Sequence, residues 1–191
     1  MKKILIILLI TVSTISLKAQ EHLTFKGVPI DGTLDTYVDN MQKAGFSFIG
    51  KQEGIALLTG DFAGHRNCTV AVITLESMDI VNKITVLFDT YQDWANMHDN
   101  YSILKDLLST KYGKHQKCVE KFEGYIQPRD DNSRMHELSM DRCKYITTWE
   151  TDKGFIELQI TKGQYSGGMV SLSYWDKINT MSIKEKALED L

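Results

Sequence analysis

Proline is almost absent from this chain, and its scarcity favours regular secondary structure. Only 2 prolines occur among 191 residues, and no stretch is rich in proline, serine and glycine. Hydrophobic side chains make up 42% of the sequence, which is more than a disordered chain contains. Residues 20–191 are enough for one domain with its own hydrophobic core. We therefore predict a single folded domain over residues 20–191, without a flexible linker.

Long apolar runs are also lacking, except at the N-terminus. Lys2 and Lys3 precede an apolar stretch over residues 4–17, and Lys18-Ala19-Gln20 ends it. A basic start, a short apolar centre and a small residue before the cut are typical of a secretory signal. The stretch is shorter than the roughly 20 residues that a membrane-spanning helix needs. We predict a signal peptide over residues 1–19, a periplasmic or secreted protein, and no membrane span after cleavage.

Positive charge is not in excess. The chain has 22 basic and 25 acidic residues, a net charge of −3, and removal of the three leader lysines leaves −6. Nucleic acids and anionic membranes select basic surfaces. The charge therefore argues against both as partners and leaves a protein, a peptide or a glycan.

Cysteine occurs only three times, at Cys68, Cys118 and Cys143. Disulfides persist in oxidising compartments, and an odd number leaves one thiol over. We expect a disulfide between Cys68 and Cys118, because the longer loop restricts the unfolded chain more. A bond between Cys118 and Cys143 is the alternative.

Two helices are predicted by apolar residues at three- and four-residue spacing. The first covers residues 34–44, with Thr33 as its N-cap and Gly45 after its end. The second covers residues 94–112 and ends at Gly113. A capping box that begins at Ser182 predicts a short C-terminal helix.

Strands are predicted where apolar and polar residues alternate between turn residues. They cover residues 23–30, 47–51, 55–62, 69–76, 81–88, 117–125, 144–150, 155–161 and 169–175. Residues 127–142 are polar and predict a loop with at most one helical turn. A helix followed by about four strands thus occurs twice, over residues 22–90 and 91–178. We predict an α+β fold in which two helix-plus-antiparallel-strand repeats form one sheet, with the helices on one face.

Two motifs resemble those of small, uncharacterised secreted bacterial proteins. The first is Tyr101-x-x-Leu104-Lys105 with Lys111-Tyr112-Gly113, followed by Cys118-Val119-Glu120, and the second is Gly60-Asp61-Phe62-Ala63-Gly64 before Cys68. This resemblance implies no activity. The repeated helix-and-sheet order is also similar to the β-lactamase-inhibitor-protein architecture. That likeness concerns topology alone, since no matching binding-loop residues are present.

Catalytic and metal-binding motifs are missing. Neither a P-loop nor a dinucleotide glycine pattern occurs, and the glycine-rich segment 163–168 does not have G-x-S-x-G spacing. His115-x-x-Cys118 is not matched by a second compact pair of zinc ligands. We therefore expect no catalytic residues, no cofactor and no metal. A hydrolase that uses Glu150 with Glu157, or Cys143 with a histidine, is kept as an alternative.

The last three strands predict an open sheet face that mixes aromatic and polar side chains. Aromatic rings give a large contact area with few rotatable bonds, and interfaces are enriched in them. The opposite expectation is that the tryptophans are buried, as most large aromatic residues are. The sequence favours a non-enzymatic binding module, and a self-assembling envelope protein is a further alternative. The predicted binding residues are Tyr145, Trp149, Glu157, Gln159, Ser171, Ser173 and Trp175.

Overall fold

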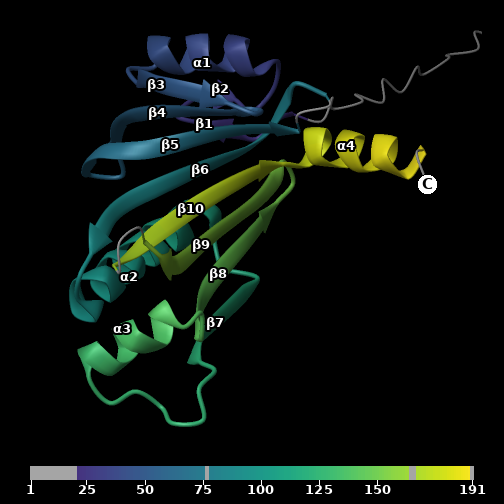
Figure 1. The fold of residues 1–191 in the computed structure, drawn as a ribbon. Coiled ribbons are helices and arrows are strands. Elements are labelled where there is room, and N and C mark those ends of the chain that lie inside the picture. Colours follow the sequence, from purple (N-terminus) through teal and green to yellow (C-terminus); the bar gives the residue numbers. More distant parts are fainter. Residues whose placement is uncertain (1–20, 76–77, 164–166, 190–191) are drawn as a thin grey trace, which may run out of the picture.

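The computed structural model describes residues 21–75, 78–163 and 167–189. The predicted signal peptide lies outside these ranges, as does the centre of the 163–168 segment. The described chain contains a large antiparallel sheet of eight strands, a small sheet of two strands, and four helices (Figure 1). The predicted α+β fold class is therefore confirmed.

The eight-stranded sheet consists of two four-stranded meanders joined in the middle. The first meander is β3 (Ser47–Gln52), β4 (Ile55–Phe62), β5 (His65–Leu75) and β6 (Ile80–Tyr91). The second is β7 (Lys117–Phe122), β8 (Cys143–Thr151), β9 (Gly154–Lys162) and β10 (Gly168–Asp176). The strand order is β3-β4-β5-β6-β10-β9-β8-β7, so β6 and β10 pair at the centre.

Three of the four described helices pack against one face of this sheet. Helix α1 (Leu34–Lys43) contacts β3 to β6, and α2 (Trp94–Tyr112) contacts β6, β8, β9 and β10. Helix α3 (Asp131–Ser139) packs beside α2 over β8, β9 and β10. Opposed residues along the strands, such as Leu58, Val70 and Val86, all point to this covered face and are fully buried. The buried side chains of both halves form one hydrophobic cluster.

The ends of α1 and α2 follow the predicted capping. The Thr33 hydroxyl accepts a hydrogen bond from the Thr36 backbone N–H at 3.3 Å, which satisfies one of the free amides of the first turn. Asp93 caps α2 in the same way, accepting from the Asn96 backbone N–H at 2.9 Å. Gly113 follows α2 with φ +84°, a conformation that favours glycine. Both predicted helices are confirmed to within a residue.

Three predicted elements are corrected. Residues 23–30 form a tight hairpin of β1 (Thr24–Phe25) and β2 (Val28–Pro29) rather than one strand, because Lys26 and Gly27 both have positive φ and turn the chain. Residues 131–139 form helix α3 rather than a loop, and Asp130 and Ser133 supply its capping box. Helix α4 (Lys177–Glu189) begins directly after β10 and passes through Ser182, so the predicted start there is wrong.

The predicted disulfide is also wrong, since Cys68, Cys118 and Cys143 are all free thiols. Cys68 lies on β5 and Cys118 on the edge strand β7, five strand spacings away. Five spacings correspond to about 24 Å, far beyond the Cα separation that a disulfide allows. Cys118 and Cys143 are on adjacent strands, but Cys118 pairs with Thr147 and Cys143 with Phe122.

None of the helices in the described part of the chain is both long enough and apolar enough to cross a membrane.

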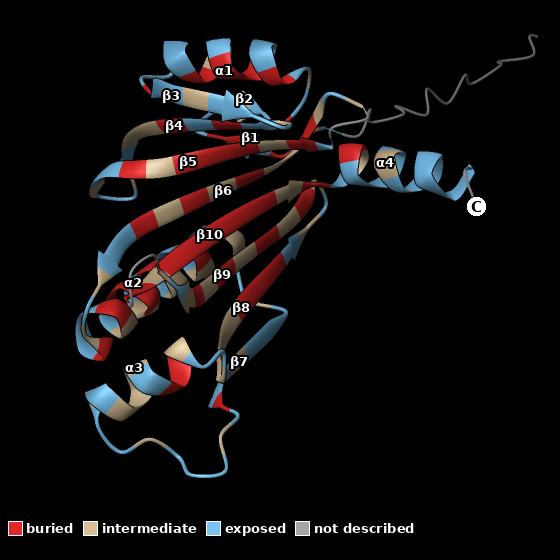
Figure 2. Cartoon of the chain, viewed as in Figure 1, coloured by how far each residue is buried: buried red, intermediate tan, exposed pale blue. Residues whose placement is uncertain are grey.

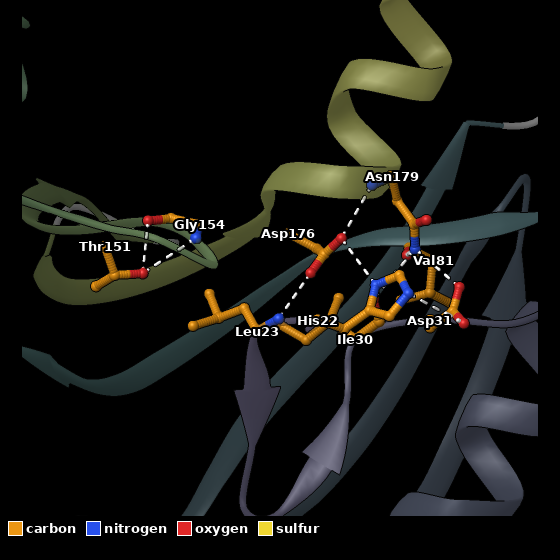
Figure 3. Close-up of polar contacts among 9 residues, drawn as sticks. All are labelled: His22, Leu23, Ile30, Asp31, Val81, Thr151, Gly154, Asp176 and Asn179. Atoms are coloured by element: carbon orange, nitrogen blue, oxygen red, sulfur yellow. Dashed lines mark hydrogen bonds and ion pairs between the residues drawn. The ribbon is translucent and has the colours of Figure 1, made fainter. Parts of the chain in front are cut away.

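A buried polar network fixes both ends of the chain to the sheet (Figure 3). Asp176, at the end of β10, is fully buried. Its carboxylate accepts hydrogen bonds from the Leu23 backbone N–H at 2.7 Å, from the Asn179 backbone N–H at 2.9 Å and from His22 Nδ1 at 3.0 Å. The bond from Asn179 satisfies an amide in the first turn of α4. Asp176 therefore sets where α4 begins and where the N-terminal segment lies.

Asn179 completes this network with its side-chain amide. Its Nδ2 lies 3.1 Å from the Ile30 carbonyl oxygen, 2.9 Å from the Val81 carbonyl oxygen and 3.0 Å from Asp31 Oδ1. These acceptors come from the segment after β2 and from β6. One buried side chain thus joins α4 to two distant parts of the chain.

Asn179→Ala should lower the free energy of unfolding by roughly 2–4 kcal/mol, because it leaves these oxygens without their donor. The matched control is Asn132→Ala in α3, which removes an exposed amide and should change stability by less than about 0.5 kcal/mol. Urea unfolding followed by circular dichroism measures both. Equal midpoints for the two variants would contradict the role of Asn179.

Candidate binding face

The second face of the sheet carries no helix in the described part of the chain. We call it the open face. Its residues are exposed or partly exposed along most strands, while those of the opposite face are buried. Buried and less buried residues accordingly alternate along the strands in Figure 2. Its side chains, by strand register, are Ile55, Leu57, Thr59, Thr69, Ala71, Ile73, Leu75, Lys83, Thr85, Leu87, Ser171, Ser173, Trp175, Phe155, Glu157, Gln159, Ile146, Thr148, Glu150 and Lys117.

Five of the seven predicted binding residues lie on the open face: Glu157, Gln159, Ser171, Ser173 and Trp175. The cross-strand partners of Ser173 are Glu157 on β9 and Thr85 on β6. Ser171 likewise lies between Gln159 and Leu87. The predicted alternation of β9 and β10 is therefore correct.

Tyr145 and Trp149 were assigned to the wrong face. Trp149 pairs with Ile156, which points under α2, and its side chain is only 1% exposed. Its Nε1 donates to the Gly113 carbonyl at 3.2 Å, and Tyr145 packs edge-on against Trp94 with ring centroids 5.0 Å apart. The other side of β8 carries Lys144, Thr148 and Glu150. An antiparallel strand buries its less polar side. Comparing the polarity of the two sides of β8 would therefore have predicted correctly which side is buried.

An aromatic and charged cluster lies where β6, β10 and β9 run side by side, close to the end of β10 from which α4 begins. Phe155 on β9, Trp175 on β10 and Lys83 on β6 are direct cross-strand partners. The Phe155 and Trp175 ring centroids are 5.4 Å apart and tilted by 57°. Lys83 Nζ lies 4.5 Å from the Trp175 ring centroid, within the range of a cation–π interaction. We call Lys83, Phe155, Glu157 and Trp175 the central cluster.

The two charges of the central cluster are partly withdrawn from water. Burial raises the pKa of Glu157 above its ordinary value, and the positive charges of Lys83 and Lys117 lower it less. Burial likewise lowers the pKa of Lys83, against the opposing effect of Glu157. Both shifts disfavour the charged forms, as desolvation does. Lys83 is not among the predicted binding residues because its strand, β6, lies far from β9 along the chain. Phe155 is on the same side of β9 as Glu157, so the alternation of side chains along the strand could have found it.

Small polar groups border the central cluster. Ser171 and Ser173 are each only 3% exposed, because their larger neighbours shield them. The Ser173 and Thr85 hydroxyls are hydrogen-bonded at 2.9 Å. The buried Ser171 hydroxyl has no hydrogen-bond partner within the described residues. An unsatisfied buried hydroxyl is unfavourable for the folded state.

In the first half of the open face, on β4 and β5, most side chains are apolar. Ile55 is 40% exposed, Leu57 37% and Leu75 42%, and Ile73 lies across from Ile55. In β4 the residues on both sides are apolar, so periodicity could not show which side is covered. The polar central cluster and this apolar half thus lie side by side on one surface.

Comparison of the chain with protein families, with curated proteins and with solved structures found no match.

The chemistry of the described residues bears on the catalytic alternatives. No group of three or more His, Cys, Asp and Glu side chains in residues 21–75, 78–163 and 167–189 could hold a metal ion. Burial raises the pKa of Cys143 to about 12. Its thiol is therefore protonated near neutral pH, whereas a nucleophile must be a thiolate. The hydrolase alternative that uses Cys143 is not supported.

A shallow cleft of about 240 Å³ opens where the open face meets the start of α4. Phe155, Trp175 and Glu150 line its floor, and Thr180 of α4 lines its side. The Gln116 side-chain amide donates to Glu150 at 2.7 Å. The cleft extends the central cluster towards the end of the sheet, so the aromatic rings are accessible from this side.

The pKa of Glu157 should lie above 4.5, the ordinary value for its carboxyl group. A carbon-detected NMR titration measures this pKa. Lys83→Met should raise this pKa further, because it removes a nearby positive charge. Lys121→Met on β7 is the control and should leave the pKa of Glu157 unchanged. A pKa of Glu157 at or below its ordinary value would show that water reaches the carboxylate freely.

The raised pKa of Glu157 also determines how the stability of the fold changes with pH. The folded protein binds a proton at Glu157 more readily than the unfolded chain does, so this group stabilises the folded state as the pH falls through its raised pKa. Glu157→Gln should therefore remove part of the dependence of unfolding free energy on pH in that window. Urea unfolding at a series of pH values measures this slope. An identical slope in the variant would contradict the raised pKa.

Proposed function

We propose that this protein is an exported binding module whose open face contacts a partner protein. The observation that carries this proposal is the central cluster, where Trp175 and two partly desolvated charges lie on a sheet face that none of the described helices covers. Export rests on the leader pattern of residues 1–19, and the site of action would be the periplasm or the cell exterior.

The composition of the open face favours a protein over a glycan or a nucleic acid. Protein interfaces combine an aromatic or apolar centre with surrounding polar groups. The central cluster supplies the aromatic ring, and Ile55, Leu57 and Leu75 extend it with exposed apolar area. A glycan would find few hydrogen-bonding groups across this apolar half. From β4 to β8 the face is about 24 Å wide, which suits a folded partner.

The charges of the open face would contribute to specificity. Lys83 and Glu157 lie beside each other and are already partly removed from water. A partner that supplies complementary charges would satisfy both, whereas one with like charges would be rejected.

Photocrosslinking tests the proposed surface in the producing cell. A photoreactive amino acid at Leu57, on the open face, should give a defined crosslinked product that mass spectrometry identifies as another protein. The same amino acid at Asp106, exposed on the outer side of α2, is the control and should give none. Products identified as copies of this chain would instead support the self-assembling envelope protein.

Trp175→Ala should weaken binding of the purified partner at least about tenfold, because tryptophan at the centre of an interface carries much of its binding energy. Tyr125→Ala is the matched control, since Tyr125 is fully exposed in the loop before α3, and it should bind as the wild type does. Isothermal titration calorimetry gives both affinities, and circular dichroism confirms that the variants are folded. Equal affinity for both variants would overturn the assigned surface.

A small hydrolase remains the second candidate because the register brings two carboxylates together. Glu150 pairs with Phe155, and Glu157 lies two residues further along β9, so the two side chains are diagonal neighbours on the open face. A glycosidase uses two carboxyl groups on one surface, and its general acid needs a raised pKa. Turnover of chromogenic glycosides by the wild type, lost in Glu157→Gln, would favour this function.

A further inference from the structure

An apolar cavity of about 190 Å³ opens on the opposite side of the sheet from the open face. It lies between α2 and the turns that join β1 to β2 and β4 to β5. Its floor consists of Leu104 and Leu108 from α2 with Leu172 and Tyr174 from β10. This cavity separates the part of the molecule covered by α1 from the part covered by α2 and α3.

The floor of this cavity is rigid. Leu104 and Leu172 are each 1% exposed, and Tyr174 is 3% exposed, so their positions are fixed by the surrounding core. The ring of Phe62, which forms one wall, stacks on Phe25 with centroids 5.1 Å apart. Phe25 in turn packs edge-on against Tyr174 at 5.5 Å. A preformed apolar cavity binds an apolar group without first having to be ordered.

The mouth of the cavity is positively charged. The two charged residues that line it are both lysines, Lys26 at the tip of the β1–β2 hairpin and Lys111 near the end of α2. Lys26 is held in the tight turn with φ +51°. Lys111 Nζ lies 4.9 Å from the Tyr112 ring centroid. An anionic group at the mouth would therefore meet two cations while its apolar part remained inside.

We propose that this cavity binds a medium-chain carboxylate, with the hydrocarbon chain on the leucine floor and the carboxylate beside Lys26 and Lys111. The size of the cavity sets the chain length. An apolar cavity of about 150 Å³ accepts benzene, so this one holds about six to eight carbons. The site is separate from the open face and does not depend on the proposed function.

Octanoate, hexanoate and octanol are the probes, added to the ¹⁵N-labelled protein and followed by NMR. Octanoate should give saturable shifts at the amides of Phe62, Leu104 and Leu172, and should bind about tenfold more tightly than hexanoate because it buries two more methylenes. Octanol should bind several-fold more weakly than octanoate, since it carries no charge for the lysines. Absence of saturable shifts with octanoate would overturn the proposal.

Variants at the mouth distinguish this site from nonspecific binding. Leu107 lines the cavity and is 51% exposed, so Leu107→Glu should weaken octanoate binding at least about tenfold without unfolding the protein. Ile103→Glu is the matched control, because Ile103 is 58% exposed one turn earlier on α2 and does not line the cavity. Equal loss in both variants would overturn the assigned site.

The charge at the mouth has its own test. The double variant Lys26→Gln and Lys111→Gln should bind octanol as the wild type does but should lose the preference for octanoate. Octylamine should bind the wild type more weakly than octanol does, because the lysines repel it. Equal binding of octanoate, octanol and octylamine by the wild type would overturn the carboxylate as the ligand group and leave only an adventitious apolar cavity.

Discussion

The pairing of β6 with β10 is the constraint on which the rest of the structure depends. These strands are the last of the first and second meanders, and their register aligns Val86 with Leu172 and Ile84 with Tyr174. Because side chains alternate along a strand, a slip of one residue would turn the apolar side of one meander towards the polar side of the other. The observed register instead continues one apolar layer from β4 to β9. The shared core under α1 and α2, the open face and the cavity all follow from this alignment.

Local patterns predicted most of the secondary structure but not the side of every strand. The caps at Thr33 and Gly113 and the spacing of apolar residues in α2 depend on neighbours in sequence, so they could be recognised without coordinates. On β8, the large rings of Tyr145 and Trp149 indicated a recognition surface, although Thr148 and Glu150 made the opposite side the more polar one. On β4, Ile55 and Leu57 alternate with Ala56 and Leu58, and no polar residue marks the exposed side. Tertiary packing decided both cases.

Contacts between distant segments could not be predicted at all. The central cluster joins Lys83 of the first repeat to Trp175 of the second, and only the strand order brings them together. The start of α4 is set by Asp176 and Asn179, which interact with residues about 150 positions earlier. The separation of Cys68 from Cys118 likewise follows from their strands rather than from loop length. In each case the deciding information is the order of strands in the sheet.

The open face differs from an ordinary exposed sheet surface in two ways. Charged residues on an exposed sheet are normally well hydrated, yet Lys83 and Glu157 are partly buried, and this burial shifts the pKa of each towards its uncharged form. Large apolar residues are normally covered when they occur together, yet Ile55, Leu57 and Leu75 are exposed. Neither feature stabilises the isolated domain. Natural sequences tend to keep locally unfavourable features of this kind at functional sites. A partner that covered the apolar side chains would also compensate the charges.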